Sequence, residues 1–361
     1  MALDRIILST FRNHRDSRLD GAAEVNLLIG ENGAGKTNVL EALSLLAPGR
    51  GMRRAALADM ATNAGAGGFA VGASLDPGDG GDAVRLGTAV IPPRTGRRLV
   101  QVNGAEASAV SLGEWLAMGW LTPAMDRLFA DPASVRRRYM DRLAVALDPA
   151  HARHAARYEN ALRERNRLLA GDLPPDPAWL DSIEAQMAPP AALLAAGRAR
   201  LIGALSHGLE ALPDSPFARP HLTYAPGAGF GEEALLAGWR EGRQRDRQAQ
   251  RTLTGPHRDE LQVRMAGKNM PAADCSTGEQ KAMLVAITIA HAELAAAGRP
   301  SILLLDEVAA HLDPVRREAL FDRLRGSGTQ VWVTATEAAP FAAIMREAAV
   351  WQVKDGAVRS A

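Results

Sequence analysis

A glycine-rich segment near the N-terminus constrains the fold of this 361-residue chain more than any other feature. An apolar stretch at 23–29 runs into the segment, and apolar residues recur at helical spacing after it. The segment has the pattern Gly-x4-Gly-Lys-Thr, and it consists of Gly30, Glu31, Asn32, Gly33, Ala34, Gly35, Lys36, Thr37 and Asn38. A strand, a glycine loop and a helix in this order form a P-loop, in which loop N–H groups and the helix N-terminus face phosphate. The sequence therefore predicts an α/β fold with a nucleotide site, and an ordinary glycine turn before a helix is the alternative.

A second segment supplies the groups that a P-loop by itself lacks. Residues 301–305 are apolar and are followed by Asp306 and Glu307, which predicts a buried strand with two carboxylates at its end. We predict ATP and Mg2+ as cofactors, with Thr37 and Asp306 as metal ligands. Lys36 and Glu307 are the predicted catalytic residues, Lys36 as a cation for the phosphates and Glu307 as the group that polarises the attacking water. The alternative is a strand that ends in a polar turn.

The residues that open a predicted helix over 277–298 resemble the signature sequence of ABC-class ATPases. They read Ser276-Thr277-Gly278-Glu279-Gln280. In that class the signature of one subunit contacts the γ-phosphate that another subunit binds. The resemblance implies nucleotide contacts for Ser276, Gly278, Gln280 and, in the D-loop, Asp313, and it leaves Thr334 or Thr336 as a γ-phosphate sensor. A capping box is the other interpretation, since Ser276 and Glu279 have the spacing S-x-x-E.

The order of predicted elements divides the chain into three parts. Strand patterns at 68–75, 83–91 and 97–103 predict an antiparallel meander, and alternating helices and strands after 277 predict parallel strands. The region 107–211 has a helical pattern, with predicted breaks at Pro123, Pro149, Pro174–Pro175 and Pro189–Pro190. We predict an ABC-type P-loop ATPase head with a mixed sheet and an inserted helical lobe, without a long coiled coil. The predicted boundaries are 1–112 and 214–361 for the head and 113–213 for the lobe.

Composition limits the location and the partners of the chain. Its 42 basic and 41 acidic side chains give a net charge of +1, and aromatic residues make up 4%. The charge provides no overall positive field, and the few aromatics disfavour a surface that stacks single-stranded bases. Cys275 is the single cysteine, so the chain cannot form an internal disulfide. No apolar run approaches the roughly 20 residues of a membrane span. We expect a cytoplasmic protein with no membrane partner.

Further segments resemble the RecF family, the short relatives of the SMC-type repair ATPases. The P-loop continues as Asn38-Val39-Leu40-Glu41, unlike that of transporters, and the interval from Lys36 to Ser276 is longer than transporters have. The other matching segments are Phe11-Arg12-Asn13-His14, Arg136-Arg137-Arg138-Tyr139-Met140-Asp141, Thr254-Gly255-Pro256-His257-Arg258-Asp259 and 304–313. His14 departs from the family, which prefers tyrosine there. The segments extend over most of the chain in the order that the family has.

This resemblance implies an ATP-dependent homodimer that binds double-stranded DNA at gaps or junctions. It implies a weak, DNA-stimulated ATPase that serves as a conformational switch in DNA replication, recombinational gap repair and the SOS response. RecO and RecR are the implied partners in loading the RecA recombinase. A nucleotide-binding subunit of an ABC transporter and a binding adaptor with a vestigial site remain as alternative functions.

Arginine clusters are the candidate DNA contacts. We single out Arg136, Arg137, Arg138 and Arg258. Further clusters at 153–167 and 240–251 have acidic residues among them, so that a solvated helix face with ion pairs is an equal alternative there. The chemistry of the segment 254–259 does not follow from the sequence.

Overall fold

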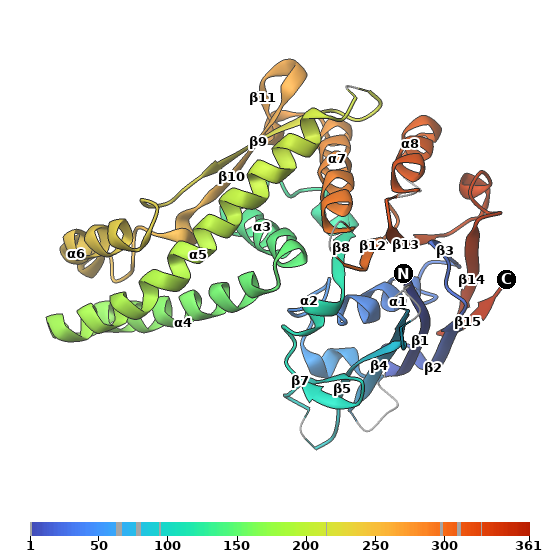
Figure 1. The fold of residues 1–361 in the computed structure, drawn as a ribbon, viewed down its shortest axis with the longest axis horizontal. Coiled ribbons are helices and arrows are strands. Elements are labelled where there is room, and N and C mark those ends of the chain that lie inside the picture. The colour runs from blue at the N-terminus through green and yellow to red at the C-terminus, as the bar shows by residue number, and fades with distance from the viewer. Residues whose placement is uncertain are drawn as a thin grey trace. The chain divides into compact units, whose positions relative to one another are not determined.

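The chain forms two compact units in the computed structural model (Figure 1). The structure describes residues 2–62, 67–76, 81–93, 95–213, 215–296, 299–308, 312–325 and 327–361. The first unit, which we call the P-loop unit, comprises Met1–Asp126, Asp214–Phe217 and Leu284–Ala361. The second, the helical unit, comprises Arg127–Pro213 and Ala218–Met283.

A six-stranded sheet of order β15-β14-β3-β13-β12-β8 forms the centre of the P-loop unit. The pairs from β14 to β8 are parallel, and β15 is antiparallel to β14. Every residue of β3, β12 and β13 is buried, as expected for parallel strands that are covered on both faces. The elements are β3 (Val25–Ile29), β8 (Ala117–Leu121), β12 (Ser301–Leu305), β13 (Thr329–Ala335), β14 (Ala348–Lys354), β15 (Ala357–Ser360), α1 (Lys36–Ser44), α2 (Leu112–Trp115), α7 (Thr277–Ala296) and α8 (Pro314–Leu324). The unit boundary falls inside α7.

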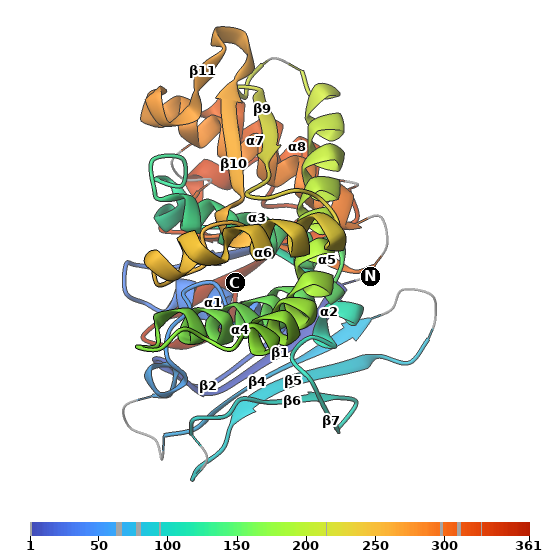
Figure 2. The same cartoon turned by 90° about the vertical axis from the view of Figure 1, so that its left-hand side faces the viewer.

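An antiparallel meander of order β2-β1-β4-β5-β6-β7 is the second sheet of this unit (Figure 2). Its strands are β1 (Ala2–Phe11), β2 (His14–Asp20), β4 (Phe69–Asp76), β5 (Val84–Val90), β6 (Leu99–Val102) and β7 (Ala105–Ala107). The three strands that the sequence predicts between 68 and 103 are thereby confirmed.

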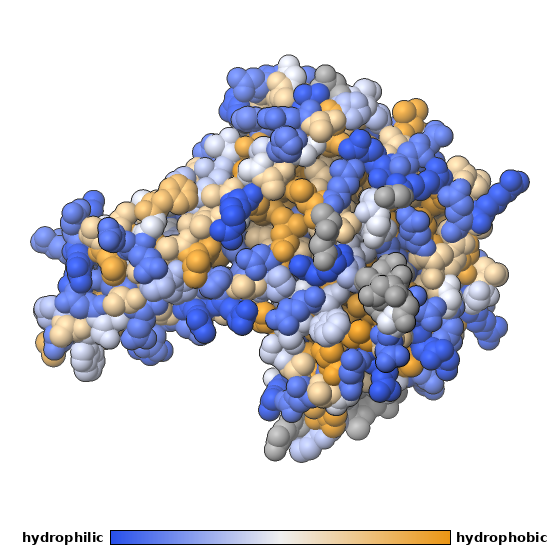
Figure 3. Space-filling view, viewed as in Figure 1, coloured by the Kyte–Doolittle hydropathy of each residue, from blue (hydrophilic) through white to orange (hydrophobic). Residues whose placement is uncertain are grey.

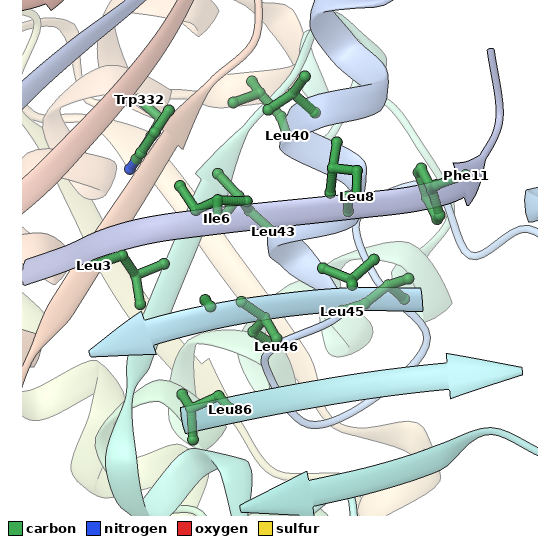
Figure 4. Close-up of a cluster of buried hydrophobic side chains, with 14 of the residues drawn as sticks. Leu3, Ile6, Leu8, Phe11, Leu40, Leu43, Leu45, Leu46, Leu86 and Trp332 are labelled. Atoms are coloured by element: carbon green, nitrogen blue, oxygen red, sulfur yellow. The ribbon is translucent and has the colours of Figure 1, made fainter. Parts of the chain in front are cut away.

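The core of the P-loop unit lies where α1 packs against the meander (Figure 4). Leu3, Ile6, Leu8 and Phe11 of β1 are fully buried, and they share one cluster with Leu40 and Leu43 of α1. A bulge between Leu3 and Arg5 shifts the side-chain alternation of β1 by one residue, so that Leu3 also faces the core. Trp332 of β13 belongs to the same cluster. Helix α1 is therefore fixed by apolar contacts to both sheets.

Long helices and a small sheet make up the helical unit. The helices are α3 (Ala133–Leu147), α4 (Ala150–Ala170), α5 (Pro177–Glu210) and α6 (Glu232–Gln248), and α4 and α5 run side by side (Figure 1). The sheet has the order β11-β10-β9, from β9 (Pro220–Ala225), β10 (Glu260–Met265) and β11 (Met270–Pro271). Among the described helices of the whole chain, none has the length and apolarity needed to cross a membrane.

The division of the chain differs from the predicted one at two places. Residues 117–121, predicted as part of the helical lobe, form β8 and pair with β12, Gly119 opposite Leu303. A short apolar run does not distinguish strand from helix, and here pairing with β12 decides. Residues 218–283, predicted as part of the head, belong to the helical unit, where β9 and β10 pair over six residues.

The predicted helix break at Pro189–Pro190 is wrong. Both prolines lie inside α5, which continues to Glu210. Each proline inside a helix costs about 3 kcal/mol, since it removes a hydrogen bond and crowds the preceding turn. Burial of side chains along α5 contributes about 1.5–3 kcal/mol each and offsets the cost of both prolines, with Met187, Leu194, Leu201 and Leu205 all buried.

Candidate nucleotide site

The loop between β3 and α1 requires glycine at several positions. Gly33 and Gly35 have φ angles of 82° and 116°, which other residues rarely adopt. A Cβ on Gly30 would lie 2.2 Å from the carbonyl oxygen of Val353, and a Cβ on Gly35 would lie 2.8 Å from Nε2 of His14. Backbone conformation and close packing, in addition to any ligand, therefore fix the glycine pattern.

Lys36 closes over this loop. Its Nζ donates to the carbonyl oxygens of Gly30 at 2.6 Å and Glu31 at 2.9 Å. Burial lowers the pKa of Lys36, while the carboxylates of Glu307 and Asp306 oppose the shift. A bound phosphate would compete with the two carbonyl groups for the ammonium group.

The two predicted metal ligands lie in contact. Oδ1 of Asp306 accepts hydrogen bonds from the hydroxyls of Thr37 at 2.8 Å and Thr334 at 2.9 Å. Burial raises the pKa of Asp306, and both hydroxyls oppose this shift. A hydroxyl and a carboxylate are the oxygen ligands that Mg2+ prefers. Over the described residues no group of three or more His, Cys, Asp or Glu could hold a metal ion.

Thr334 has a different environment from the one expected of a γ-phosphate sensor. It is fully buried on β13, and its hydroxyl accepts from the backbone N–H of Glu307 at 2.8 Å while it donates to Asp306. Glu307 has a φ of 55°, a conformation that is uncommon for a non-glycine residue. Thr334 therefore holds both residues that follow β12. Thr336 is exposed, and its sensor role stays a prediction.

Two residues of the β1–β2 turn brace the P-loop, and sequence reasoning assigned no role to them. Nδ2 of Asn13 donates to the carbonyl oxygen of Ala34 at 3.0 Å, and Oδ1 of Asn13 accepts from Nδ2 of Asn38 at 2.7 Å. Nε2 of His14 lies 3.1 Å from the carbonyl oxygen of Gly35. One sequence feature points to this contact. The segment 11–14 resembles a family motif, although its residues by themselves indicate no chemical role. Asn38, predicted to contact nucleotide, uses its side chain within this brace.

The same turn is tied to α1 by an ion pair, and the P-loop is tied to the β14–β15 turn by a backbone hydrogen bond. Nε and NH2 of Arg12 donate to the two carboxylate oxygens of Glu41 at 2.9 and 2.8 Å, and the Glu41 side chain is fully buried. The backbone N–H of Gly356 donates to the carbonyl oxygen of Ala34 at 3.0 Å. Residues from both ends of the chain therefore set the conformation of the loop.

The signature segment lies at the start of α7, within the helical unit. Ser276 and Glu279 form the capping box, with the backbone N–H and the hydroxyl of Ser276 each 2.9 Å from Oε2 of Glu279. Nε2 of Gln280 donates to the carbonyl oxygen of Cys275 at 2.9 Å, so Gln280 points into the protein. Gly278 is exposed, and a Cβ there would meet nothing within 4 Å. Glycine costs a helix about 1 kcal/mol relative to alanine. Because a side chain would fit at position 278, packing within the chain does not explain why glycine is there.

Asp313, the predicted D-loop residue, caps α8. Its Oδ1 accepts from the backbone N–H of Arg316 at 3.0 Å, and the side chain is exposed. The site roles of Asp313 and of the signature residues stay predictions.

The four arginines proposed for DNA contact have different environments. Arg136 forms a bidentate pair with Glu260 at 2.7 and 2.9 Å, and Arg137 donates to the carbonyl oxygen of Asp259 at 2.9 Å. Arg138 and Arg258 are exposed, and neither forms an ion pair within the part of the chain that the structure describes. The DNA contacts of all four stay predictions, and exposure makes Arg138 and Arg258 the more accessible pair.

In the other arginine clusters, ion pairs are formed by Arg165, Arg167, Arg240 and Arg243. Arg243 contacts Glu184 and Asp181 at 2.5 and 2.7 Å, and Arg240 lies 3.4 Å from Asp181. Arg165 is fully buried beside Glu184 and Asp246. Figure 3 shows hydrophilic side chains interspersed with hydrophobic ones around α4 and α6. These helix faces fit the ion-paired interpretation.

Two of the family-like segments meet inside the helical unit. Asp141 ends the segment 136–141 and Asp259 ends the segment 254–259, and Arg198 of α5 contacts both carboxylates at 2.8 Å. Arg198 also donates to the carbonyl oxygen of Pro256 at 2.6 Å. Burial raises the pKa of Asp141, but hydrogen bonds from His151 and Arg198 bring it below its usual value. The segment 254–259 therefore has a structural role in this unit.

The parallel sheet, with Thr37 at the start of α1 in contact with Asp306 at the end of β12, defines a P-loop ATPase head of the ABC/SMC class. A family profile described as the RecF/RecN/SMC N terminal domain matches residues 2–359. The DNA replication and repair protein RecF of Mesorhizobium japonicum is 46% identical over 370 residues, with 99% of this chain and 97% of the relative covered. The corresponding protein of Rhizobium meliloti is 45% identical over 368 residues, with 99% and 98% covered. The chain belongs to the RecF family, as its sequence motifs predict.

Solved structures support the fold. A structure of the recombination mediator protein RecF-ATP in the RecFOR pathway matches with a TM-score of 0.87 and 22% identity, and covers 100% of this chain and 97% of the other. An SMC head bound to the C-winged helix domain of ScpA matches with a TM-score of 0.57, 16% identity and coverage of 100% and 97%. The predicted α/β head of the ABC/SMC class is confirmed. Membership in the RecF family also disfavours the transporter subunit that the sequence left open.

Proposed function

We propose that this chain is an ATP-dependent DNA-binding repair protein that dimerises on ATP and uses slow hydrolysis as a switch. The observation that carries the proposal is the contact of Thr37 with Asp306, which sets a hydroxyl and a carboxylate beside the P-loop. Residues that bind Mg2+ with nucleotide phosphates in P-loop ATPases have this chemistry. A vestigial site that no longer binds a ligand would have no physical reason to retain the Asp306 carboxylate, because a buried carboxylate is costly without a ligand or a full set of partners.

The loop N–H groups and four side chains of this chain would act on ATP. The loop N–H groups and Lys36 bind the phosphates, and Thr37 and Asp306 hold Mg2+, which when bound offsets phosphate charge. Glu307 accepts a proton from the water that attacks the γ-phosphorus, the bond to the bridging oxygen of ADP breaks, and inorganic phosphate leaves. Thr334 keeps Glu307 in place through its backbone N–H.

A second copy of the chain would complete the site. Ser276 and Gly278 of one copy would contact the γ-phosphate held by the other, since the exposed N-terminus of α7 favours an anion. The open space at Gly278 leaves room for such an approach. ATP then joins two copies, and hydrolysis releases them.

We further propose that the ATP dimer binds double-stranded DNA at gaps or junctions and acts with RecO and RecR to load RecA. The names of the relatives, DNA replication and repair protein RecF and recombination mediator protein RecF in the RecFOR pathway, support this role. Recombinational gap repair and the SOS response in the cytoplasm are the corresponding processes. Arg138 and Arg258, which are exposed, are the candidate phosphate contacts.

Sedimentation velocity with Mg2+ and ATP, ADP or no nucleotide tests the proposal. We expect dimers with ATP and monomers with ADP, and further association with a gapped duplex only in ATP. The variant Glu307→Gln should bind ATP and dimerise as the wild type does, while its turnover falls about 100-fold or more. Wild-type protein that stays monomeric with ATP and duplex DNA contradicts the proposed dimer, and normal turnover of the variant removes Glu307 from the mechanism.

A further inference from the structure

A lysine outside the predicted motifs contacts the signature segment. Lys268 ends the short helix η4 (Ala266–Lys268), and its Nζ donates to Oε1 of Glu279. The second oxygen of the same carboxylate, Oε2, accepts from the backbone N–H and the hydroxyl of Ser276. One carboxylate therefore connects the turn after β10 to the signature serine.

The turn that presents Lys268 is ordered by its own hydrogen bonds. Nε of Arg264 donates to Oδ1 of Asn269 at 2.8 Å, and the backbone N–H of Asn269 donates to the carbonyl oxygen of Ala266 at 3.3 Å. Lys268 is also one of only four lysines in the chain, whose other basic residues are arginine. These hydrogen bonds therefore hold the turn in a conformation that places the ammonium group of Lys268 next to Glu279.

Glu279 raises an electrostatic problem for a signature that binds phosphate. The hydrogen bond from Lys268, with those from Ser276, lowers the pKa of Glu279 to about 2, so the carboxylate is ionised at neutral pH. A γ-phosphate that approaches Ser276 and Gly278 brings further negative charge to the same helix N-terminus. Like charges repel more strongly once an interface closes and water leaves. A counter-ion is needed for the two anions to coexist.

We propose that Lys268 is a positioning residue for the ATP-bound dimer, where it neutralises Glu279 and holds it against the backbone of Ser276. The signature then accepts the γ-phosphate of a second copy without repulsion from its own cap. Lys268 acts through Glu279 and need not touch the nucleotide. This proposal rests on the ATP-dependent dimer of the proposed function.

A charge-removal series in the full chain tests the proposal. The variants are Lys268→Ala, Lys268→Arg, Glu279→Gln and the double variant Lys268→Ala with Glu279→Gln. Glutamine keeps the capping box but carries no charge. The control is Arg97→Ala, which removes an ion pair with Glu106 in the P-loop unit and changes a basic side chain about as exposed as that of Lys268. The dimer dissociation constant is measured by sedimentation with a slowly hydrolysed ATP analogue at low salt.

We expect Lys268→Ala to raise the dimer dissociation constant about tenfold and the double variant to restore it to within about threefold of the wild type. Lys268→Arg and Arg97→Ala should dimerise normally, and the effect of Lys268→Ala should shrink in about 0.5 M salt because screening reduces repulsion. ADP affinity of the P-loop, measured by calorimetry, should be equal in all variants and reports that they fold.

Three results overturn the proposal, and they are distinguishable. Wild-type protein that stays monomeric with the analogue overturns the proposed function and this inference together. Wild-type dimers with an unaffected Lys268→Ala variant overturn this inference alone. A double variant that dimerises as weakly as Lys268→Ala also overturns this inference alone, because the role of Lys268 is then structural and independent of the Glu279 charge.

Discussion

At the scale of single residues, Thr334 links the two carboxyl residues that follow β12. Its hydroxyl has one proton, which it gives to Asp306, and a lone pair, which accepts the backbone N–H of Glu307. Thr37 gives a second hydrogen bond to the same oxygen of Asp306. The orientation of Asp306 and the backbone position of Glu307 thus depend on a side chain from the neighbouring strand.

Replacement of Thr334 by valine should impair hydrolysis more than stability. We expect Thr334→Val to lower kcat for ATP about tenfold or more and the free energy of unfolding by about 1–2 kcal/mol, because the Glu307 N–H loses its partner. Thr334→Ser, which keeps the hydroxyl, is the control. Steady-state ATPase rates and urea titrations measure the two effects, and a valine variant with wild-type kcat contradicts the assigned role.

The partly buried His257 should make stability depend on pH. Its Nε2 donates to the carbonyl oxygen of Thr252 at 3.0 Å and its Nδ1 accepts from the hydroxyl of Tyr158 at 2.7 Å, which requires the neutral ring. Burial lowers its pKa to about 4. The unfolded chain binds the proton near pH 6.5 and the folded chain does not, so stability is complete above that pH. It falls as the pH drops through this window, by about 3 kcal/mol at pH 4.

The variant His257→Gln isolates this contribution. An amide can donate to Thr252 and accept from Tyr158, but it does not titrate. Urea titrations between about pH 7 and pH 4 should show a smaller loss of stability for the variant than for the wild type. Burial lowers the pKa of His14 and His154 as well, so the wild type and the variant share their contribution. Equal pH dependence of the two proteins rules out the His257 assignment.

The contacts at the residue scale were only partly predictable. Lys36, Thr37, Asp306 and Glu307 follow from the sequence, because each belongs to a local pattern that chemistry requires. The partnership of Asn13 with Ala34 does not, because it joins residues that are 21 positions apart and depends on how the meander packs. Spacing along a strand or helix carries no information on such contacts.

At the scale of elements, α5 organises the helical unit through Arg198. This side chain connects α5 to Asp141 of α3 and to Asp259 and Pro256 near the start of β10. Asp259 in turn accepts from the hydroxyl of Tyr224 on β9. One guanidinium group therefore sets the relative positions of two helices and a sheet inside the unit.

Loss of Arg198 should destabilise the helical unit strongly. We expect Arg198→Met to lower the free energy of unfolding by about 3–5 kcal/mol, because Asp141 and Asp259 then remain charged without their main partner. Arg200→Met is the matched control, since Arg200 is 67% exposed and lies 3.8 Å from Asp148. Thermal and urea unfolding compare the two, and a loss below about 1 kcal/mol for Arg198→Met contradicts this role.

Predictability at the element scale depends on where the deciding contact lies. Residues 302–305 of β12 are one isoleucine and three leucines, so their own composition indicates a buried strand. β8 has the residues Ala117-Met118-Gly119-Trp120-Leu121, which show no strand preference by themselves. Only the edge of β12 makes them a strand, and the sequence does not show which segment pairs with that edge.

At the scale of the whole molecule, a net charge of +1 restricts how DNA could be held. Without an overall positive field, DNA binding would depend on a few local arginines, and the proposed ATP dimer would double their number. The sequence predicts this in outline, but it does not separate the ion-paired Arg136 from the exposed Arg138. The position of Glu260, from a different element, makes the difference.

Exposed arginines should set the salt dependence of DNA binding. If Arg138 and Arg258 bind phosphates, each alanine variant should reduce the slope of log affinity against log salt by about 2 with ATP present, because each of the two copies in the proposed dimer neutralises one phosphate fewer. Arg97→Ala, in an exposed ion pair on the meander, is the control. Fluorescence anisotropy with a gapped duplex gives the slopes, and slopes equal to the wild type exclude these residues from the DNA interface.

The place of β3 in the sheet has a consequence for synthesis of the chain. β3 carries the P-loop near the N-terminus, but its neighbours in the sheet are β13 and β14, which begin at residues 329 and 348. A ribosome therefore completes almost the entire polypeptide before β3 finds a partner on either edge. A truncated product retains the glycine motif yet has no sheet to support it, so retention on immobilised nucleotide would distinguish full-length molecules from fragments that carry the same motif.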